Sequence, residues 1–171
     1  VTELGRLDIL INNAAWQSSH QDIQDLPSEE WDRAFKTNIY AMFWLSKAAL
    51  RHLPAGGSII NTTSIQSFRP SPSLIHYAST KGAITTFTKA LSQFGLKQSV
   101  RVNAVAPGPV WTPLIPATLP EDSVQHFGQD NQMGRPAQPA ELAPTYVYLA
   151  SDDASFVSGQ VIGVTGGTPI V

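Results

Sequence analysis

Short apolar runs alternate along the chain with longer amphipathic stretches. Residues 7–15, 57–64 and 100–108 begin apolar and end in small or polar residues, and a fourth apolar run covers 160–164. Short runs that are apolar on both faces are typical of strands buried in a parallel sheet. We therefore predict about four strands, three of which open into polar loops at their carboxyl ends.

The stretches between these runs have the spacing of helices. In residues 28–53 an apolar stripe at four-residue steps runs through Trp31, Phe35, Ile39 and Phe43. Ser28 can cap this helix, and acidic residues occupy its first turn. A second long helix is predicted over 74–97 and a third over 139–150, where Pro139 suits a first turn. Strands that alternate with helices predict an α/β fold.

Residues 109–139 break the alternation. Four prolines, Pro109, Pro113, Pro116 and Pro120, forbid one continuous helix, although residues 121–127 can form a short one. A loop of this length in a compact domain is usually a lid or a binding segment. Trp111, Leu114, Ile115 and Phe127 would give such a lid apolar walls; the alternative is a poorly ordered surface loop.

Composition narrows the class of protein. The 171 residues fit one domain, and a net charge of −2 argues against a nucleic-acid surface. There is no cysteine, which excludes disulfides and thiolate metal sites, and the four histidines lack metal-ligand spacing. No long apolar run predicts a membrane span. We expect a cytoplasmic protein with no metal and no membrane partner.

Tyr77 and Lys81 are the strongest candidates for chemistry. They lie four residues apart in a helical stretch and therefore share a face, and Ser64 lies thirteen residues upstream of Tyr77. A cation beside a phenol lowers the pKa of the phenol from about 10. A tyrosine tuned in this way can exchange a proton with a carbonyl or alcohol oxygen. A solvated surface pair is the alternative.

The polar ends of the predicted strands support a site. Asn12, Asn13, Thr62 and Ser64 follow two of them, and Pro107-Gly108 follows a third. In open α/β sheets ligands bind beyond the carboxyl ends of the strands. His76 beside Tyr77 is expected at the surface, because adjacent helix residues point apart.

Together these motifs resemble the C-terminal part of a short-chain dehydrogenase/reductase. The matching residues are Asn12-Asn13-Ala14-Ala15, Asn38, Ser64, Tyr77, Lys81, Pro107 to Thr112, Gly134-Arg135-Pro136, Ala140 to Ala143 and Val164 to Gly167. Ala15 stands where the family usually has glycine. The resemblance implies a doubly wound, Rossmann-like parallel sheet. It is nearest to a branch of glucose or general-stress dehydrogenases and aldehyde reductases.

The resemblance also implies the roles of the site residues. Tyr77 would be the acid/base, Lys81 would lower its pKa and hold the nicotinamide ribose, and Ser64 would donate to the developing oxyanion. Asn38 would hold a water linked to Lys81, or would be a structural buried asparagine. The residues implied to bind NAD or NADP are Asn12, Ala14, Tyr77, Lys81, Pro107, Gly108, Val110 and Thr112.

One motif of the resembled family does not occur. No Gly-x-x-x-Gly-x-Gly is present, and Val1–Gly5 reads as the end of a helix. We therefore interpret residues 1–171 as a single partial domain that lacks the glycine-rich βαβ portion. Two functions remain open: an NAD(P)-dependent oxidoreductase acting on a small alcohol, aldehyde or ketone, or a catalytically silent remnant. A homodimer or homotetramer through the two long helices is expected, with a further contact at the exposed edge of the first strand.

Overall fold

A computed structural model describes residues 1–170 and contains one parallel sheet. Its strands, in spatial order, are β1 (Ile9–Asn12), β2 (Ser58–Thr62), β3 (Arg101–Pro107) and β4 (Val161–Val164). All neighbouring pairs are parallel, so the carboxyl ends of the four strands share one edge. The α/β fold and the four predicted strands are confirmed.

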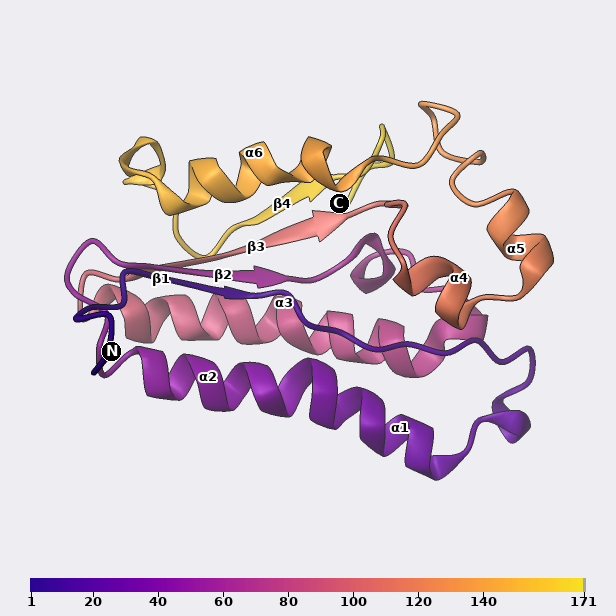
Figure 1. Ribbon diagram of the computed structural model, residues 1–171, viewed down its shortest axis with the longest axis horizontal. Coiled ribbons are helices and arrows are strands. Elements are labelled where there is room, and N and C mark those ends of the chain that lie inside the picture. The colour runs from indigo at the N-terminus through magenta and orange to yellow at the C-terminus, as the bar shows by residue number, and fades with distance from the viewer. Residues whose placement is uncertain (171) are drawn as a thin grey trace.

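Helices cover both faces of the sheet (Figure 1). One face carries α1 (Ser28–Phe35), a π-helix over Lys36–Tyr40, α2 (Ala41–Ala49) and the long α3 (Ile75–Leu96). The other face carries α6 (Pro139–Ala150). The short helices α4 (Leu114–Thr118) and α5 (Glu121–Gln125) lie beyond the carboxyl ends of the strands.

Four single turns of 3-10 helix complete the elements. They span Ile23–Asp25, Ile65–Ser67, Pro72–Leu74 and Asp152–Ala154. None of the helices within residues 1–170 is both long and apolar enough to cross a membrane.

Two apolar clusters hold the layers together. Ile59 and Val102 pack with Ala49 and Leu53 on the α2 side, whereas Ile60 packs with residues of α6 and β4 on the other. Successive side chains of a strand point to opposite faces, so neighbouring residues of β2 enter different clusters. Every residue of β2 is buried, which explains why its sequence is not amphipathic.

The predicted helix over 28–53 is wrong in three details. It is interrupted by the π-helix at Lys36–Tyr40, it ends at Ala49, and its N-cap is Pro27, so Ser28 is the first helical residue. The buried Asn38 gives the reason for the interruption. Its amide bonds the main chain of Trp16 and the hydroxyl of Thr80, and the wider turn accommodates this inward side chain.

Two other segments depart from prediction. Val1–Gly5 closes a single turn, in which the Gly5 amide donates to the Val1 carbonyl, and forms no helix. Residues 114–118 form α4, which the prolines concealed. Pro116 is the third residue of α4, where the main-chain N–H has no partner within a helix, so proline costs no hydrogen bond there.

Candidate functional site

A cavity of about 880 Å³ lies at the carboxyl ends of β1, β2 and β3. Ala14 and Ala15 line it from the loop after β1, and Thr62 to Ser64 from the end of β2. Pro107 to Val110 line it from the end of β3. The expectation that a ligand site forms where these strands end is therefore met by a cavity of suitable size.

Helix α3 brings Tyr77 and Lys81 into the same cavity. The Lys81 ammonium is buried and donates to the Thr62 carbonyl at 2.8 Å, and the Thr63 hydroxyl donates to the Lys81 carbonyl at 2.8 Å. These two contacts tie α3 to the end of β2. The Lys81 nitrogen lies 5.2 Å from the centroid of the Tyr77 ring.

The expectation that Lys81 lowers the pKa of Tyr77 is wrong for this chain. Burial raises the pKa of Tyr77 to about 12; the Ser64 hydroxyl opposes this rise, and the nearby Tyr146 adds to it. Burial also lowers the pKa of Lys81 to about 7, so the amine loses much of the charge that was expected to act on the phenol. Tyr77 remains partly exposed where it lines the cavity.

Most residues expected at the site line the cavity, and two do not. Ala14, Ser64, Tyr77, Lys81, Pro107, Gly108, Val110 and Thr112 all line it. Asn12 and Asn38 are buried beneath it. Asn12 donates to Ser46 of α2 and to Asn61 of β2, so it joins strand and helix.

The Asn38 amide is occupied by protein partners. Its nitrogen donates to the Trp16 carbonyl and to Thr80, and its oxygen accepts from the Trp16 amide at 2.8 Å. Its side chain therefore positions the loop after β1. A water linked to Lys81 would have to use the Asn38 main chain.

Gly108 is required by close packing. A Cβ atom there would lie 2.7 Å from the carbonyl oxygen of Thr165, which is main chain and cannot move aside cheaply. The loop after it is held by main-chain bonds in which Ala137 donates to Pro109 and Trp111 donates to Ala137. Of the four apolar lid residues expected, Leu114, Ile115 and Phe127 line the cavity, whereas Trp111 does not.

Several lining residues carried no sequence signal. Gln17 lies in the loop after β1, and its amide donates to Thr118 of α4 at 3.0 Å across 101 residues. Tyr146 of α6 bonds Thr62 through its hydroxyl at 2.8 Å. Gln66, Leu74 and Leu119 were also missed. Each is an ordinary helix or loop residue in the sequence, and only the folded chain brings them together.

His76 is fully buried, so its predicted surface position is wrong. The loop after β1 covers it: the Ser18 amide donates to His76 Nε2 at 3.2 Å, and the Trp16 ring lies 5.8 Å from the imidazole. Glu30 pairs with His20 beside this contact at 2.8 Å. Within residues 1–170 no three or more histidine, cysteine, aspartate or glutamate side chains form a group that could hold a metal ion.

Acid should destabilise the fold through His76. Burial lowers the pKa of His76, followed by a smaller effect of the charge of His20, while Glu30 opposes both. The unfolded chain therefore takes up a proton that the folded chain resists. His76 therefore does not lower the stability of the fold above about pH 6.5. As the pH falls below this value, the free energy of unfolding decreases, by at most about 1.36 kcal/mol per pH unit.

Urea unfolding at pH 7.5 and pH 5 measures this effect. His76→Gln should show a smaller loss of unfolding free energy between the two pH values than the unmodified chain. His52→Gln, at an exposed position, should leave the loss unchanged. An unchanged loss in His76→Gln would contradict the assignment.

Comparison with known proteins places the chain in a family. A family model described as "Enoyl-(Acyl carrier protein) reductase" matches residues 1–169. General stress protein 39 of Bacillus subtilis is 54% identical over 167 residues, which cover 98% of this chain and 58% of that protein. NADPH-dependent aldehyde reductase 1, chloroplastic, of Arabidopsis thaliana is 44% identical over 171 residues, which cover 99% of this chain and 59% of that protein.

A solved structure agrees with these matches. The 3-ketoacyl-(acyl-carrier-protein) reductase from Brucella melitensis, complexed with NADH, superposes with a TM-score of 0.87 at 29% identity; the match covers 97% of this chain and 69% of that one. The chain thus spans a little under three fifths of the length of the curated relatives. The sequence matches, the parallel sheet and the cavity agree that the chain belongs to the short-chain dehydrogenase/reductase family of oxidoreductases.

Proposed function

We propose that the chain carries the reactive half of an NAD(P)-dependent oxidoreductase that interconverts an alcohol with an aldehyde or ketone. The observation that carries this proposal is that Tyr77, Lys81 and Ser64 line one cavity at the carboxyl ends of the strands. The family membership of the chain supports the same reaction class. A cytoplasmic location, and the interpretation as a partial domain, belong to this proposal.

Two of the three side chains, Tyr77 and Ser64, act on the carbonyl group in its reduction. Tyr77 gives its proton to the carbonyl oxygen, and Ser64 stabilises the charge that develops there. A reduced nicotinamide, when bound, would supply the hydride that the carbonyl carbon takes up, so that C=O becomes CH–OH. Oxidation of an alcohol is the reverse, with the Tyr77 oxygen taking the proton.

The residues around Lys81 fit the nicotinamide riboside part of the cofactor. The Lys81 ammonium makes one hydrogen bond within residues 1–170, to the Thr62 carbonyl, so its remaining N–H groups can donate to ribose hydroxyls. Gly108, Val110 and Thr112 line the same wall and would hold the nicotinamide amide. Ala14, in the loop after β1, would border the ribose, and the buried Asn12 would support this loop from beneath the cavity.

The cavity offers fewer suitable residues for the diphosphate of the cofactor than for the nicotinamide riboside part. Lys81 is the only charged residue among those of residues 1–170 that line the cavity. This observation favours the second candidate function, a catalytically silent remnant that folds without binding cofactor. The two candidates make different predictions for binding.

Calorimetric titration separates them. If the nicotinamide riboside part is what the chain holds, NADH, NADPH and reduced nicotinamide riboside should bind with similar affinity, on the order of 1 mM, because they share that part. Both cofactors are tested because one relative is named an NADPH-dependent aldehyde reductase and one similar solved structure is a complex with NADH. No heat from any of the three compounds at several millimolar would support the remnant.

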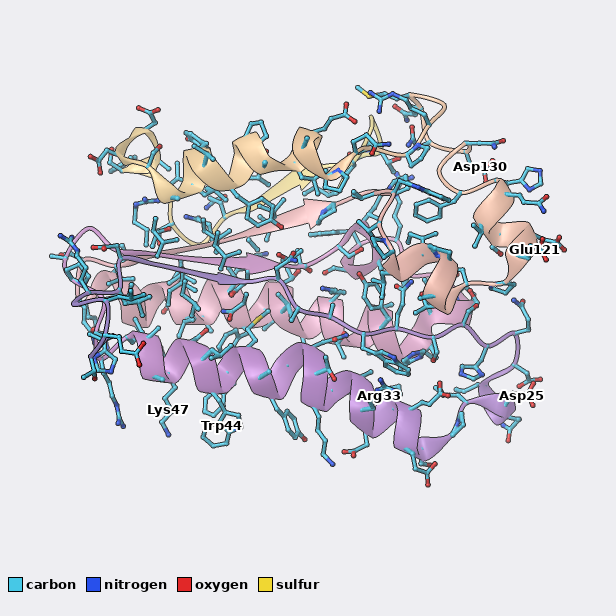
Figure 2. All side chains as sticks on the ribbon, in the orientation of Figure 1. Asp25, Arg33, Trp44, Lys47, Glu121 and Asp130 are labelled. Atoms are coloured by element: carbon cyan, nitrogen blue, oxygen red, sulfur yellow. The ribbon has the colours of Figure 1, made fainter. Side chains whose placement is uncertain are left out.

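We also propose that the chain forms a dimer or tetramer through α2 and α3. Their outer faces expose large apolar side chains, Phe43, Trp44, Leu45, Phe94 and Leu96. A groove of about 500 Å³ runs between them, lined in part by Phe87 and Leu91. Figure 2 shows Trp44 and Lys47 pointing from α2 away from the sheet. Exposed apolar patches of this kind mark interaction sites, and a second copy offers a matching face.

Sedimentation velocity tests this assembly. The chain should sediment as a dimer or larger, and Phe94→Asp should shift it to a monomer with an unchanged circular dichroism spectrum. Thr86→Asp, at another exposed position of α3, is the control. If Phe94→Asp stays assembled, the edge of β1, where Ile9 and Ile11 are exposed, becomes the interface to test. A monomeric unmodified chain would count against both surfaces.

A further inference from the structure

The part of the cavity beyond Tyr77 is walled mainly by apolar side chains. It extends from α3 toward α4 and α5, and its apolar members are Ile65, Leu74, Leu114, Ile115, Leu119 and Phe127. Four of these, Leu114, Ile115, Leu119 and Phe127, come from the lid segment 109–139, so a ligand held there would be enclosed by hydrocarbon. An apolar ligand body gains free energy in proportion to the surface it buries against such walls.

Among residues 1–170, this part of the cavity has no positively charged side chain that could pair with an anionic ligand. Lys81, the one charged residue that lines the cavity within residues 1–170, donates one N–H to the Thr62 carbonyl and lies over the Tyr77 ring, so its charge is at the Tyr77 end of the cavity and not among the apolar walls. The charged Glu121 and Asp130 of the lid point outward (Figure 2). A carboxylate drawn into the cavity would lose water without gaining a counter-charge, and this is costly.

Three side-chain amides line the cavity, those of Asn13, Gln17 and Gln66, and each is partly occupied; the Asn13 oxygen accepts from the Thr62 hydroxyl at 3.0 Å. The Gln17 nitrogen donates to Thr118 at 3.0 Å, and the Gln66 oxygen accepts from the Ser71 amide at 2.6 Å. One polar group of each amide remains for a ligand, in addition to Tyr77 and Ser64. A polyol gains little from the apolar walls, and each hydroxyl group that is buried against them without a partner opposes binding.

We infer that this cavity takes an uncharged carbonyl compound with an apolar body of several carbon atoms, such as a medium-chain aldehyde, in preference to a sugar or a sugar acid. The inference rests on the proposed function for the reaction, but the selectivity follows from the walls alone. The carbonyl oxygen lies at Tyr77 and Ser64, and the apolar body lies against Leu119 and Phe127.

Binding of matched alcohols tests the inference without cofactor or turnover. Hexan-1-ol, 6-hydroxyhexanoate and ribitol share a primary hydroxyl group; the first two also share the six-carbon chain. Titration followed by two-dimensional NMR of the isotope-labelled chain should show saturable shifts at Ser64 and Leu119 for hexan-1-ol. The other two compounds should bind at least about 100-fold more weakly. Equal or tighter binding of 6-hydroxyhexanoate or ribitol would overturn the inference, and so would no saturable binding of hexan-1-ol.

A variant of the wall gives the converse result. Leu119→Arg places a cation on the cavity wall and should bring the affinity for 6-hydroxyhexanoate to within about tenfold of that for hexan-1-ol. Ala117→Arg, at an exposed position of α4 outside the cavity lining, should leave the preference unchanged. An unchanged preference in Leu119→Arg would place the ligand elsewhere and overturn the inference. If the alcohols bind as expected but the cofactor titration fails, only the proposed reaction is wrong.

Discussion

Replacing Tyr77 with phenylalanine should lower kcat about 100- to 10,000-fold, the range that a positioned proton donor contributes. The variant keeps the ring that packs over Lys81 and removes only the hydroxyl, so the fold and the binding of nicotinamide should persist. The measurement is the rate of NAD(P)H oxidation with hexanal, together with the cofactor titration on the same preparation.

Tyr146→Phe is the matched control for this experiment. Tyr146 also lines the cavity and also bonds a neighbour through its hydroxyl, to Thr62. If Tyr77 has a chemical role and not only a packing role, Tyr146→Phe should stay within about tenfold of the unmodified chain. Equal losses in the two variants would remove the reason for assigning proton transfer to Tyr77.

The pH dependence of turnover gives a second test of the role of Tyr77. The pKa of Tyr77 is raised to about 12, so the phenol is protonated at neutral pH. A protonated phenol is the form that carbonyl reduction uses, whereas alcohol oxidation uses the phenolate. Reduction should therefore keep its rate from neutral to mildly alkaline pH, while oxidation should accelerate as the pH rises.

Lys81→Met should abolish turnover and make the fold more stable at pH 7. Lys81 is 2% exposed, and burial lowers its pKa from 10.5 to about 7. Burying this amine therefore costs roughly 4 kcal/mol at pH 7. Methionine fills a similar space without charge and loses only the bond to Thr62, which contributes about 1 kcal/mol. The net gain should be about 3 kcal/mol.

The gain should depend on pH with a defined sign. The unfolded lysine is protonated up to about pH 10.5, whereas the folded lysine resists protonation above about pH 7. The cost of burial is therefore full below pH 7 and disappears as the pH rises toward 10.5. Urea unfolding should show the two chains converging in stability near pH 10.

Lys89→Met, at an exposed position of the same helix, is the control and should change stability by less than about 0.5 kcal/mol at either pH. A destabilised Lys81→Met at pH 7 would mean that contacts of Lys81 outweigh the cost of burying it. Turnover retained in Lys81→Met would separate the amine from the reaction. Stability gained together with activity lost would instead show a functional group that the fold holds at a cost.

The arrangement of strands and helices could be predicted because it follows from local patterns. Short runs without amphipathic alternation, such as 57–64, are typical of strands buried in a parallel sheet. The bounds of α6 were predicted to the residue, since Pro139 suits the first turn of a helix. The π-helix at Lys36–Tyr40 could not be predicted, because it depends on contacts of Asn38 with residues 22 and 42 positions away.

The environment of the site groups was beyond prediction for the same reason. The spacing of Tyr77 and Lys81 places both on one face of α3, but the spacing contains no information on burial. The folded chain buries the amine, and burial reverses the expected direction of the tyrosine shift. His76 was misplaced because the loop that covers it comes from residues 16–20, which no local pattern of α3 reveals.

The sequence by itself therefore determined the α/β class, the order of its elements and a part of the cavity lining that includes Ser64, Tyr77 and Lys81, because periodicity and the polar ends of strands are local properties. Only the tertiary structure decided which of these residues carry charge, which are sealed beneath the cavity, and that Gln17, Tyr146 and Leu119 join its wall. Electrostatic character depends on how much water each group has lost, and that loss is settled by neighbours distant along the chain.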